Sequence, residues 1–187
     1  LENSAYVGKE ISMSGYSDFK KLDDVKKNLG LKIQECHDLF ETSKENIKPS
    51  DSLREFLSDN IELAIAIDTE KAKSEFIVAP ILAEVRRILK KQISLFSGIE
   101  FEVEPEKSLT GRCDFLISRS SEQLVVVAPV VVIVEAKDDN IKSGLAQCIA
   151  TMLASQIFND REKKPLKTIY GSVTTGQLWQ FLKLESD

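Results

Sequence analysis

Apolar residues recur at helical spacing in two long segments of the chain. The first segment, Thr69 to about Lys91, predicts the longest helix, with Thr69 as its cap. Pro80 interrupts this helix, because an interior proline removes a backbone hydrogen bond, and it predicts a kink or a division into two helices. The second segment, Ile141–Phe158, predicts another amphipathic helix. The apolar stripe of the first helix consists of Ile77, Ile81, Val85 and Ile88.

Between and after the two helices, the pattern changes to the two-residue period of β-strands. Ile99–Val103 alternates between apolar and acidic residues, which predicts a strand with one solvated face. Leu124–Val134 is apolar almost without interruption, as expected for a strand covered on both faces. This order of a helix, three strands, a helix and two strands predicts an α/β fold with a mixed sheet flanked by helices. The other strands are expected at Cys113–Ile117, Thr168–Val173 and Gln177–Leu184, with a hairpin turn at Thr174–Gly176.

Residues 14–68 are more polar and more interrupted than the core that follows at 69–187. Within them, Asp18–Leu29 predicts a short helix ended by Gly30, and Leu31–Gln34 predicts a strand. This N-terminal arm is expected to be a lid or a packing element on the core, with substrate contact or homodimerisation as alternatives.

A second helix of the arm is expected where Ser50–Ser52 can cap a run that continues to Leu57. The arm also holds His37, the only histidine, which is expected to be structural because its distance in sequence from the candidate acids offers no supporting spacing. Residues 1–13 are expected to be an expression remnant or a disordered start, with Met13 as the native first residue.

A chain of 187 residues with 42% hydrophobic and 29% charged residues is long enough for one domain with a substantial core. No apolar run approaches the length of about 20 residues that a membrane span needs, and the start lacks the basic-then-apolar pattern of a secretory signal. A cytoplasmic protein without a membrane partner is therefore expected. Cys36, Cys113 and Cys148 are scattered without CxxC spacing, which supports neither a disulfide framework nor a zinc site.

The chemistry-bearing residues are two acids and a lysine on neighbouring strand candidates. Glu135, Ala136 and Lys137 end the apolar run, and because strand side chains alternate between faces, Glu135 and Lys137 project to the same side. Asp114 stands in another β-prone run, and an adjacent strand would bring its carboxylate beside Glu135. Two carboxylates that close repel each other unless a hard cation such as Mg²⁺, which prefers carboxylate oxygens, compensates them. Lys137 can then orient or deprotonate a bound water.

The alternative is that Glu135 and Lys137 simply end a buried strand where it meets solvent. Against it, these charges emerge at the edge of a continuous apolar core. The carboxyl ends of sheet strands are where α/β proteins carry their chemistry.

These residues and the order of the elements resemble the PD-(D/E)XK superfamily of restriction-endonuclease-like nucleases over residues 69–184. The chain also resembles a group of cyanobacterial proteins of unassigned function that share this core. The resemblance implies a metal-dependent endonuclease in which Asp114 and Glu135 hold Mg²⁺ or Mn²⁺, and the Ala136 carbonyl can add a ligand. Lys137 would stabilise the attacking hydroxide or the developing charge on phosphorus. Cys113 departs from the family name, which has proline at this loosely kept position.

The resemblance also implies two further groups at the site. A glutamine on the helix after the acid–x–lysine strand often approaches the site in the superfamily, which makes Gln147 a candidate, with an ordinary surface amide as the alternative. The other group is a glutamate on the upstream helix. The competing hypothesis for the whole chain is a catalytically silent domain of this fold that binds nucleic acid or a protein partner.

Helical phase favours Glu70 as the upstream glutamate. At about 100° per residue, Glu70 falls on the sheet-facing stripe, whereas Glu75 lies about 120° to 160° from it. The similar stretch of type I restriction nuclease domains also places its glutamate ten residues before a proline, as Glu70 stands before Pro80. A break in the first turn could still bring Glu75 inward, and Glu84 shares the phase of Glu70 but is expected on a solvated flank.

DNA is the expected substrate, and the residues are compatible with RNA and with one metal ion or two. A net charge of −5 argues against strong non-specific binding to nucleic acid, because Lys and Arg supply most of that affinity. Two basic clusters could form a local track, with solvated faces as the alternative. They consist of Arg86, Arg87, Lys90 and Lys91, and of Lys163, Lys164 and Lys167.

Overall fold

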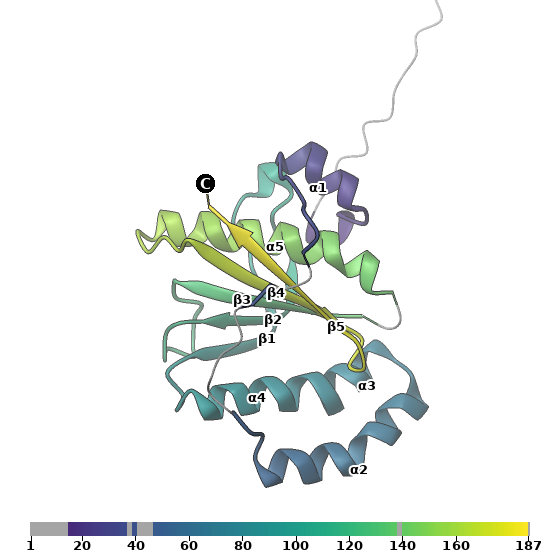
Figure 1. Cartoon of the computed structure of the whole chain (residues 1–187). Helices are drawn as coiled ribbons and strands as arrows, with labels where there is room; N and C mark the ends of the chain where they lie inside the picture. Colours follow the sequence, from purple (N-terminus) through teal and green to yellow (C-terminus); the bar gives the residue numbers. More distant parts are fainter. Residues whose placement is uncertain (1–14, 37–38, 41–46, 138–139, 187) are drawn as a thin grey trace, which may run out of the picture.

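The computed structural model describes residues 15–36, 39–40, 47–137 and 140–186, which form a five-stranded sheet with helices on both faces (Figure 1). The strand order is β1-β2-β3-β4-β5, and every neighbouring pair is antiparallel except β3 and β4. The predicted α/β fold with a mixed sheet is therefore confirmed. The strands are β1 (Ser94–Glu100), β2 (Arg112–Ser118), β3 (Val130–Ala136), β4 (Thr168–Thr174) and β5 (Trp179–Glu185).

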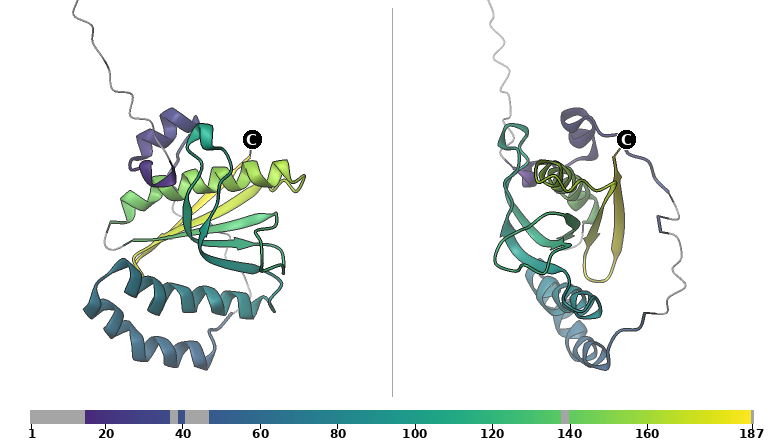
Figure 2. Two further views of the ribbon diagram at one scale, coloured as in Figure 1. Left: turned by 180° about the vertical axis from the view of Figure 1, so that it is seen from behind. Right: turned by 90° about the vertical axis from the view of Figure 1, so that its left-hand side faces the viewer.

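Helix α5 (Ile141–Arg161) connects the parallel strands β3 and β4 and covers one face of the sheet, while α4 (Ala79–Ile88) covers the other (Figures 1 and 2). The predicted helix ends at Phe158, but α5 continues to Arg161. Most of its residues are buried because the sheet lies on one side and the first segment of the chain on the other, so it is less amphipathic than predicted. No helix in the described ranges combines the length and apolarity needed to cross a bilayer.

The predicted helix from Thr69 is divided in the structure. Its parts are α3 (Glu70–Lys73), a π-helical turn η2 (Ser74–Val78) and α4, and the Thr69 hydroxyl caps the first turn by accepting from the Ala72 N–H at 3.1 Å. Because Pro80 has no N–H to donate, the ladder ahead of it loses one bond, and the Ala79 N–H reaches back to the Ser74 carbonyl instead. The predicted division at proline is confirmed, and its form is a π turn just before that residue.

The start of the arm belongs to the main core. A 3₁₀ turn η1 (Tyr16–Asp18) and α1 (Leu22–Leu29) lie over α5, and Tyr16 and Val25 are fully buried (Figure 2). The predicted stop at Gly30 is confirmed by its left-handed φ of 68°, which glycine adopts without strain. The helix begins later than predicted, because Asp18 lies in the 3₁₀ turn.

Two other predictions for the arm are wrong. Leu31–Gln34 form no strand, although Leu31 and Ile33 pack against the core. The second helix, α2 (Asp51–Ile67), is capped by the Ser50 hydroxyl as predicted, but it runs ten residues beyond Leu57, since Ala64 and its neighbours continue the face that packs on η2 and α4. The predictions for residues 1–13 and for His37 concern positions outside the described residues.

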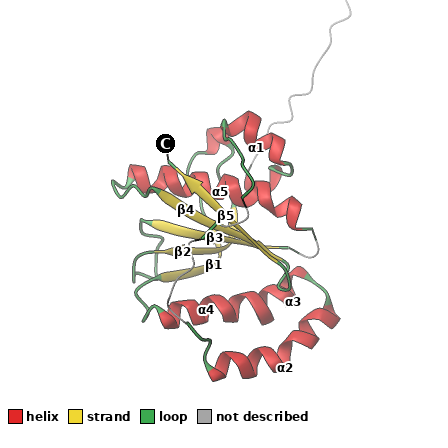
Figure 3. Ribbon diagram, in the orientation of Figure 1, coloured by secondary structure: helices red, strands yellow, loops and turns green. Residues whose placement is uncertain are grey.

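The strand predictions erred at their ends. β1 stops at Glu100, and residues 101–103 leave the regular sheet around a 3₁₀ turn η3 (Pro105–Lys107), although Phe101 N–H still donates to the Gly111 carbonyl at 2.8 Å. The apolar run at Leu124–Val134 is only partly strand: β3 starts at Val130, and Leu124 is 90% exposed in the preceding loop. Figure 3 shows the hairpin of β4 and β5, whose turn contains Gly176 at a φ of 83°, as predicted.

Candidate active site

The predicted acids and lysine meet where β3 ends, between the start of α5 and the short helix α3. Phe115 of β2 pairs with Val134 of β3, so Asp114 stands beside Glu135 just past the last regular pair. The Ala136 N–H donates to Asp114 Oδ2 at 2.8 Å. One oxygen of Asp114 is therefore fixed by the backbone of the strand that carries Glu135.

Glu135 differs from the other groups of this site in its complete burial. Its side chain is 0% exposed, and as a carboxylate neither of its oxygens has a hydrogen-bond partner among the described residues. Burial, and next the negative charge of Asp114, raise the pKa of Glu135 well above its ordinary value, while Lys137 acts in the opposite direction. Once protonated, Glu135 can share a hydrogen bond with Asp114. The arrangement stores unfavourable electrostatic energy that a bound cation would relieve.

Lys137 lies between two glutamates that come from different parts of the chain. Its Nζ is 3.8 Å from Glu135 Oε2 and 3.9 Å from Glu70 Oε2, so it forms ion pairs that are longer than hydrogen bonds. The backbone N–H of Lys137 donates to the Thr174 carbonyl at 2.8 Å, which continues the pairing of β3 with β4. The backbone of Lys137 is thus fixed by the sheet, while its ammonium group lies within ion-pair distance of both glutamates.

Gly144 in the first turns of α5 allows this close packing, and the sequence reasoning missed it. A Cβ at this position would lie 2.6 Å from Val173 Cγ1 and 2.9 Å from Lys137 Cγ. Glycine inside a helix is unfavourable by about 1 kcal/mol relative to alanine, so its presence near the start of a helix was the available signal. It lets α5 approach the aliphatic part of the lysine side chain.

The three candidate glutamates of the upstream helix have different surroundings. Glu70, on the first turn of α3, is the one that lies near Lys137. Glu75 is in the π turn and pairs with Lys71 at 2.7 Å, half-exposed to solvent. The prediction of a solvated flank for Glu84 is wrong: it is 8% exposed and accepts from the Ser50 N–H at 2.7 Å and from the Arg87 guanidinium at 2.6 and 2.7 Å.

The two remaining predicted site residues, Ala136 and Gln147, differ in their burial and in their hydrogen bonds. Ala136 is buried between Glu135 and Lys137, with its N–H bound to Asp114. Gln147 is half-buried on α5, about one turn after Gly144, and its side chain makes no hydrogen bond within the described ranges. Those ranges also contain no group of three or more Asp, Glu, Cys and His side chains already gathered as a metal site. The candidate ligand set remains two carboxylates and a carbonyl.

The basic clusters are partly used inside the protein. Arg87 holds Glu84, Arg86 Nε donates to the Ile93 carbonyl at 3.2 Å, and Lys164 Nζ donates to the Ala128 carbonyl at 3.0 Å. Lys90 and Lys91 are exposed in the turn that follows α4. A continuous basic track over these residues is therefore smaller than the sequence indicates.

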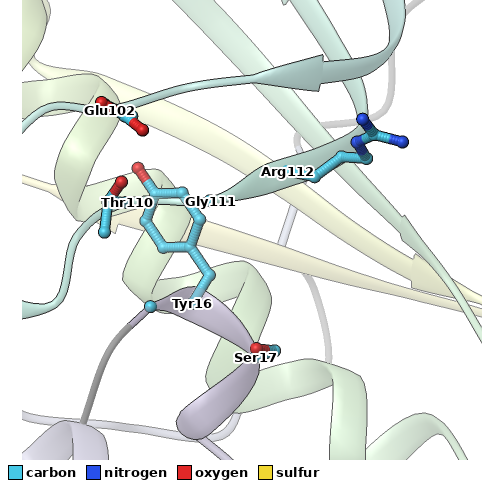
Figure 4. A pocket seen from close by; sticks show the side chains of 7 residues that line it. Tyr16, Ser17, Glu102, Thr110, Gly111 and Arg112 are labelled. Carbon is cyan, nitrogen blue, oxygen red and sulfur yellow. The ribbon is translucent and has the colours of Figure 1, made fainter.

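A hollow of about 460 Å³ lies away from these acids, where η1 meets the loop between β1 and β2 (Figure 4). The Tyr16 hydroxyl donates to the Phe101 carbonyl at 2.8 Å, and burial raises its pKa above the ordinary range. Tyr16 N–H donates to the Thr110 carbonyl, and Arg112 pairs with Glu100 at 3.1 Å. The Tyr16 hydroxyl and the Arg112 guanidinium are thus bound within the chain, and the hollow lies at the junction of the arm with the sheet.

Comparison of the chain with family models, with curated proteins and with solved structures finds no match.

Proposed function

We propose that this protein hydrolyses phosphodiester bonds in DNA with the help of Mg²⁺ or Mn²⁺, as an endonuclease of the PD-(D/E)XK type. The single observation that carries this proposal is Glu135, a buried carboxylate without a hydrogen-bond partner in the described chain, beside a second acid and a lysine. Burying such a group is costly unless a ligand compensates it. Perturbed carboxylates at the edge of a sheet are typical of functional sites.

The residues present fit a divalent cation. Asp114 and Glu135 would hold it, because Asp114 uses one oxygen for the Ala136 N–H and Glu135 uses neither as a carboxylate. The Ala136 carbonyl is the third oxygen that the local backbone can offer. When bound, Mg²⁺ or Mn²⁺ would supply charge neutralisation and a polarised water.

Lys137 and Glu70 complete the proposed roles. The ammonium group of Lys137 can approach the attacking water or a phosphate oxygen, because its ion pairs at 3.8 and 3.9 Å are loose. Glu70 keeps Lys137 oriented toward the acids and can accept a proton or a hydrogen bond from the water. Gln147 is proposed as a further contact only if substrate binding turns its half-buried side chain toward Lys137.

The alternative is a catalytically silent domain that binds nucleic acid or a protein partner. It is favoured by the ion pairs of Lys137, since a lysine between two glutamates partly compensates the buried charge without a metal ion.

The test is a cleavage assay on plasmid, linear and branched DNA with Mg²⁺, Mn²⁺ or EDTA. Cleavage that needs the metal and is absent from a Lys137→Ala protein purified in parallel would support the nuclease. Binding of DNA without any cleavage under these conditions would favour the silent domain. Cleavage retained in EDTA would contradict the proposed role of the acids.

A further inference from the structure

Lys73, the last residue of α3, is a buried lysine one turn away from Glu70. Its side chain is 8% exposed, and its ammonium group pairs with Asp68 Oδ1 at 2.6 Å. Lysine is almost never buried unless a partner compensates its charge, and fixing its long side chain costs conformational entropy. An apolar residue could fill the same space without burying a charge, so the ammonium group itself indicates a role.

Lys71, two residues earlier on the same helix, has the ordinary surroundings of a surface lysine. It is 81% exposed and pairs with Glu75 at 2.7 Å. Exposed ion pairs of this kind contribute little to stability, because water and salt screen them. The two lysines thus carry the same charge on one helix, but Lys73 is enclosed by the protein and Lys71 is not.

The backbone and the side chain of Lys73 both reach back to the link that precedes α3. The Lys73 N–H donates to the Thr69 carbonyl at 3.0 Å, and the ammonium group pairs with Asp68, the C-cap of α2. Glu70 begins α3 immediately after this link. Residues three apart are neighbours on the surface of a helix, so the contacts of Lys73 fix the turn that carries Glu70.

The hairpin turn between β4 and β5 packs on the aliphatic part of Lys73, and Figure 1 shows this turn beside α3. A Cβ at Gly176 would lie 3.5 Å from Lys73 Cβ and 3.2 Å from Ile77 Cδ1, so the backbone of the turn lies directly on α3 and η2. Two residues before Gly176, the Thr174 carbonyl accepts from the Lys137 N–H at 2.8 Å. One short turn therefore contacts Lys73 and also holds the backbone of Lys137.

These contacts surround the ion pair of Glu70 with Lys137. Lys137 Nζ lies 3.9 Å from Glu70 Oε2, which is too long for a hydrogen bond, so direct bonding does not set this distance. The distance is set by the elements that carry the two side chains. Lys73 joins those elements, because it contacts both the link before Glu70 and the turn that holds Lys137.

We propose that Lys73 is a positioning residue, which holds the first turn of α3 so that the Glu70 carboxylate stays beside Lys137. The inference rests on the proposed nuclease function and deepens it, because it adds a residue that affects turnover through Glu70. The ammonium group of Lys73 fixes α3 through Asp68, and its aliphatic part fixes α3 against the hairpin turn.

The test replaces Lys73 by methionine in the whole protein, because methionine is a good helix former with a long, flexible side chain but no charge. Asp68 is 74% exposed, so its carboxylate stays hydrated in this variant, and circular dichroism should show an intact fold. Lys73→Met should lower kcat for DNA cleavage about 10- to 100-fold with KM near that of the wild type, because a small displacement of a catalytic group has effects of this size.

Lys71→Met is the matched control, since it makes the same substitution at the exposed lysine of the same helix. Its kcat should stay within about twofold of the wild-type value. An unchanged kcat in Lys73→Met would overturn the inference. A higher KM with an unchanged kcat would also overturn it, because Lys73 would then be a substrate contact.

A double variant separates positioning from a general loss of structure. If Lys73 acts through Glu70, then adding Lys73→Met to Glu70→Gln should lower kcat further by less than about twofold. Two independent losses would instead multiply, and this outcome would overturn the inference.

Hydrogen exchange tests the anchoring of α3 without any cleavage. The Ser74 N–H, which donates to the Glu70 carbonyl, should exchange about tenfold faster in Lys73→Met, while the amides of α5 keep their wild-type rates. An unchanged rate at Ser74 would overturn the inference. Faster exchange at Ser74, in a protein whose wild type cleaves no DNA, would support the anchoring of Glu70 by Lys73 and remove the nuclease. Cleavage by the wild type, with equal kcat in Lys73→Met, would support the nuclease and remove the role of Lys73.

Discussion

Glu84 on α4 and Glu135 on β3 are the two acidic residues buried in the described part of the chain, and their surroundings affect a negative charge in opposite ways. Glu84 accepts hydrogen bonds from two nitrogens of Arg87 and from the Ser50 N–H, which lower its pKa to about 2. Burial and Asp114 raise the pKa of Glu135, and its carboxylate has no donor there.

The difference separates a structural carboxylate from a reactive one. Glu84 ties the start of α2 to α4 across 34 residues of sequence, and every interaction it makes stabilises the folded chain. Glu135 opposes folding when it is ionised, and such strain persists only where the surrounding structure fixes it. A carboxylate that destabilises the fold at the end of a strand is a candidate for function. A carboxylate whose hydrogen bonds and ion pair are all formed within the chain is explained by its structural role.

The strongest test of this comparison removes the basic side chain beside each glutamate. Lys137→Ala should lower cleavage by at least about 10²- to 10³-fold, because it removes a group that stabilises charge in the transition state. Asp114→Asn should have a similar effect with the fold intact. The control is Arg87→Ala, which removes the partner of Glu84 and should lower the melting temperature while kcat stays near that of the wild type. Cleavage rates and circular dichroism would show both effects, and normal turnover in Lys137→Ala would reject its assigned role.

A second test concerns which helix glutamate belongs to the site. Glu70→Gln should reduce turnover strongly, by about 10²-fold, because Glu70 lies near Lys137 and can act on a proton or a water. Glu75→Gln should reduce it less, since Glu75 pairs with the exposed Lys71. Steady-state kinetics of the two variants give the comparison directly. Full activity in Glu70→Gln with loss in Glu75→Gln would reverse the assignment.

The proximity of Asp114, Glu135 and Lys137 could be predicted because it depends on local rules. Alternation along a strand sets the side of Glu135 and Lys137, and the sequential strands β2 and β3 pair as neighbours. The mixed sheet, the cap at Thr69 and the hairpin at Gly176 follow from equally local signals.

The features that the sequence did not predict depend on distant parts of the chain. Glu84 is buried because the N–H of Ser50 reaches it from the start of another helix. Leu124 is an exception, because its exposure follows from a local boundary that the interpretation of the apolar run overlooked: β3 begins only at Val130, directly after Pro129, which has no N–H to donate to a sheet. The ring of Phe40 in the arm contacts Tyr170 of β4 and Phe181 of β5, and no periodicity within one segment can indicate this contact between distant parts of the chain.

Stability as a function of pH should distinguish the two glutamates with opposite sign. Native Glu135 keeps its proton above the ordinary value of 4.5, so stability falls as the pH rises from that value through its raised pKa. Glu135→Gln should therefore be more stable than the wild type at about pH 8, and the difference should vanish near about pH 4. Each kcal/mol corresponds to about 2 to 4 °C for a chain of this size.

Glu84 should behave in the reverse way. Its pKa of about 2 means that its contribution is present above the ordinary value of 4.5 and is lost as the pH falls toward 2. Glu84→Gln should thus be less stable than the wild type at neutral pH, and the difference should shrink in acid. Urea unfolding between about pH 2 and pH 8 measures the stability of both variants.

A Glu135→Gln protein that is less stable than the wild type at about pH 8 would contradict the strain assigned to Glu135.

The smallest expected effect is stabilisation by the metal ion itself. A ligand that binds only the native state, at roughly ten times its Kd, adds about 1.4 kcal/mol, which corresponds to a rise of about 3 to 6 °C in melting temperature. Mn²⁺ or Mg²⁺ should produce this rise in the wild type and in Glu84→Gln, because Glu84 lies outside the candidate ligand set. Glu135→Gln should lose most of it, even though that variant starts from a higher stability. Differential scanning calorimetry with Ca²⁺ and K⁺ as ionic controls would separate a specific site from general screening. An equal rise in melting temperature in Glu135→Gln would place the metal site elsewhere. If calorimetry detects no binding of metal at millimolar concentration, even with DNA present, the silent domain is the better account.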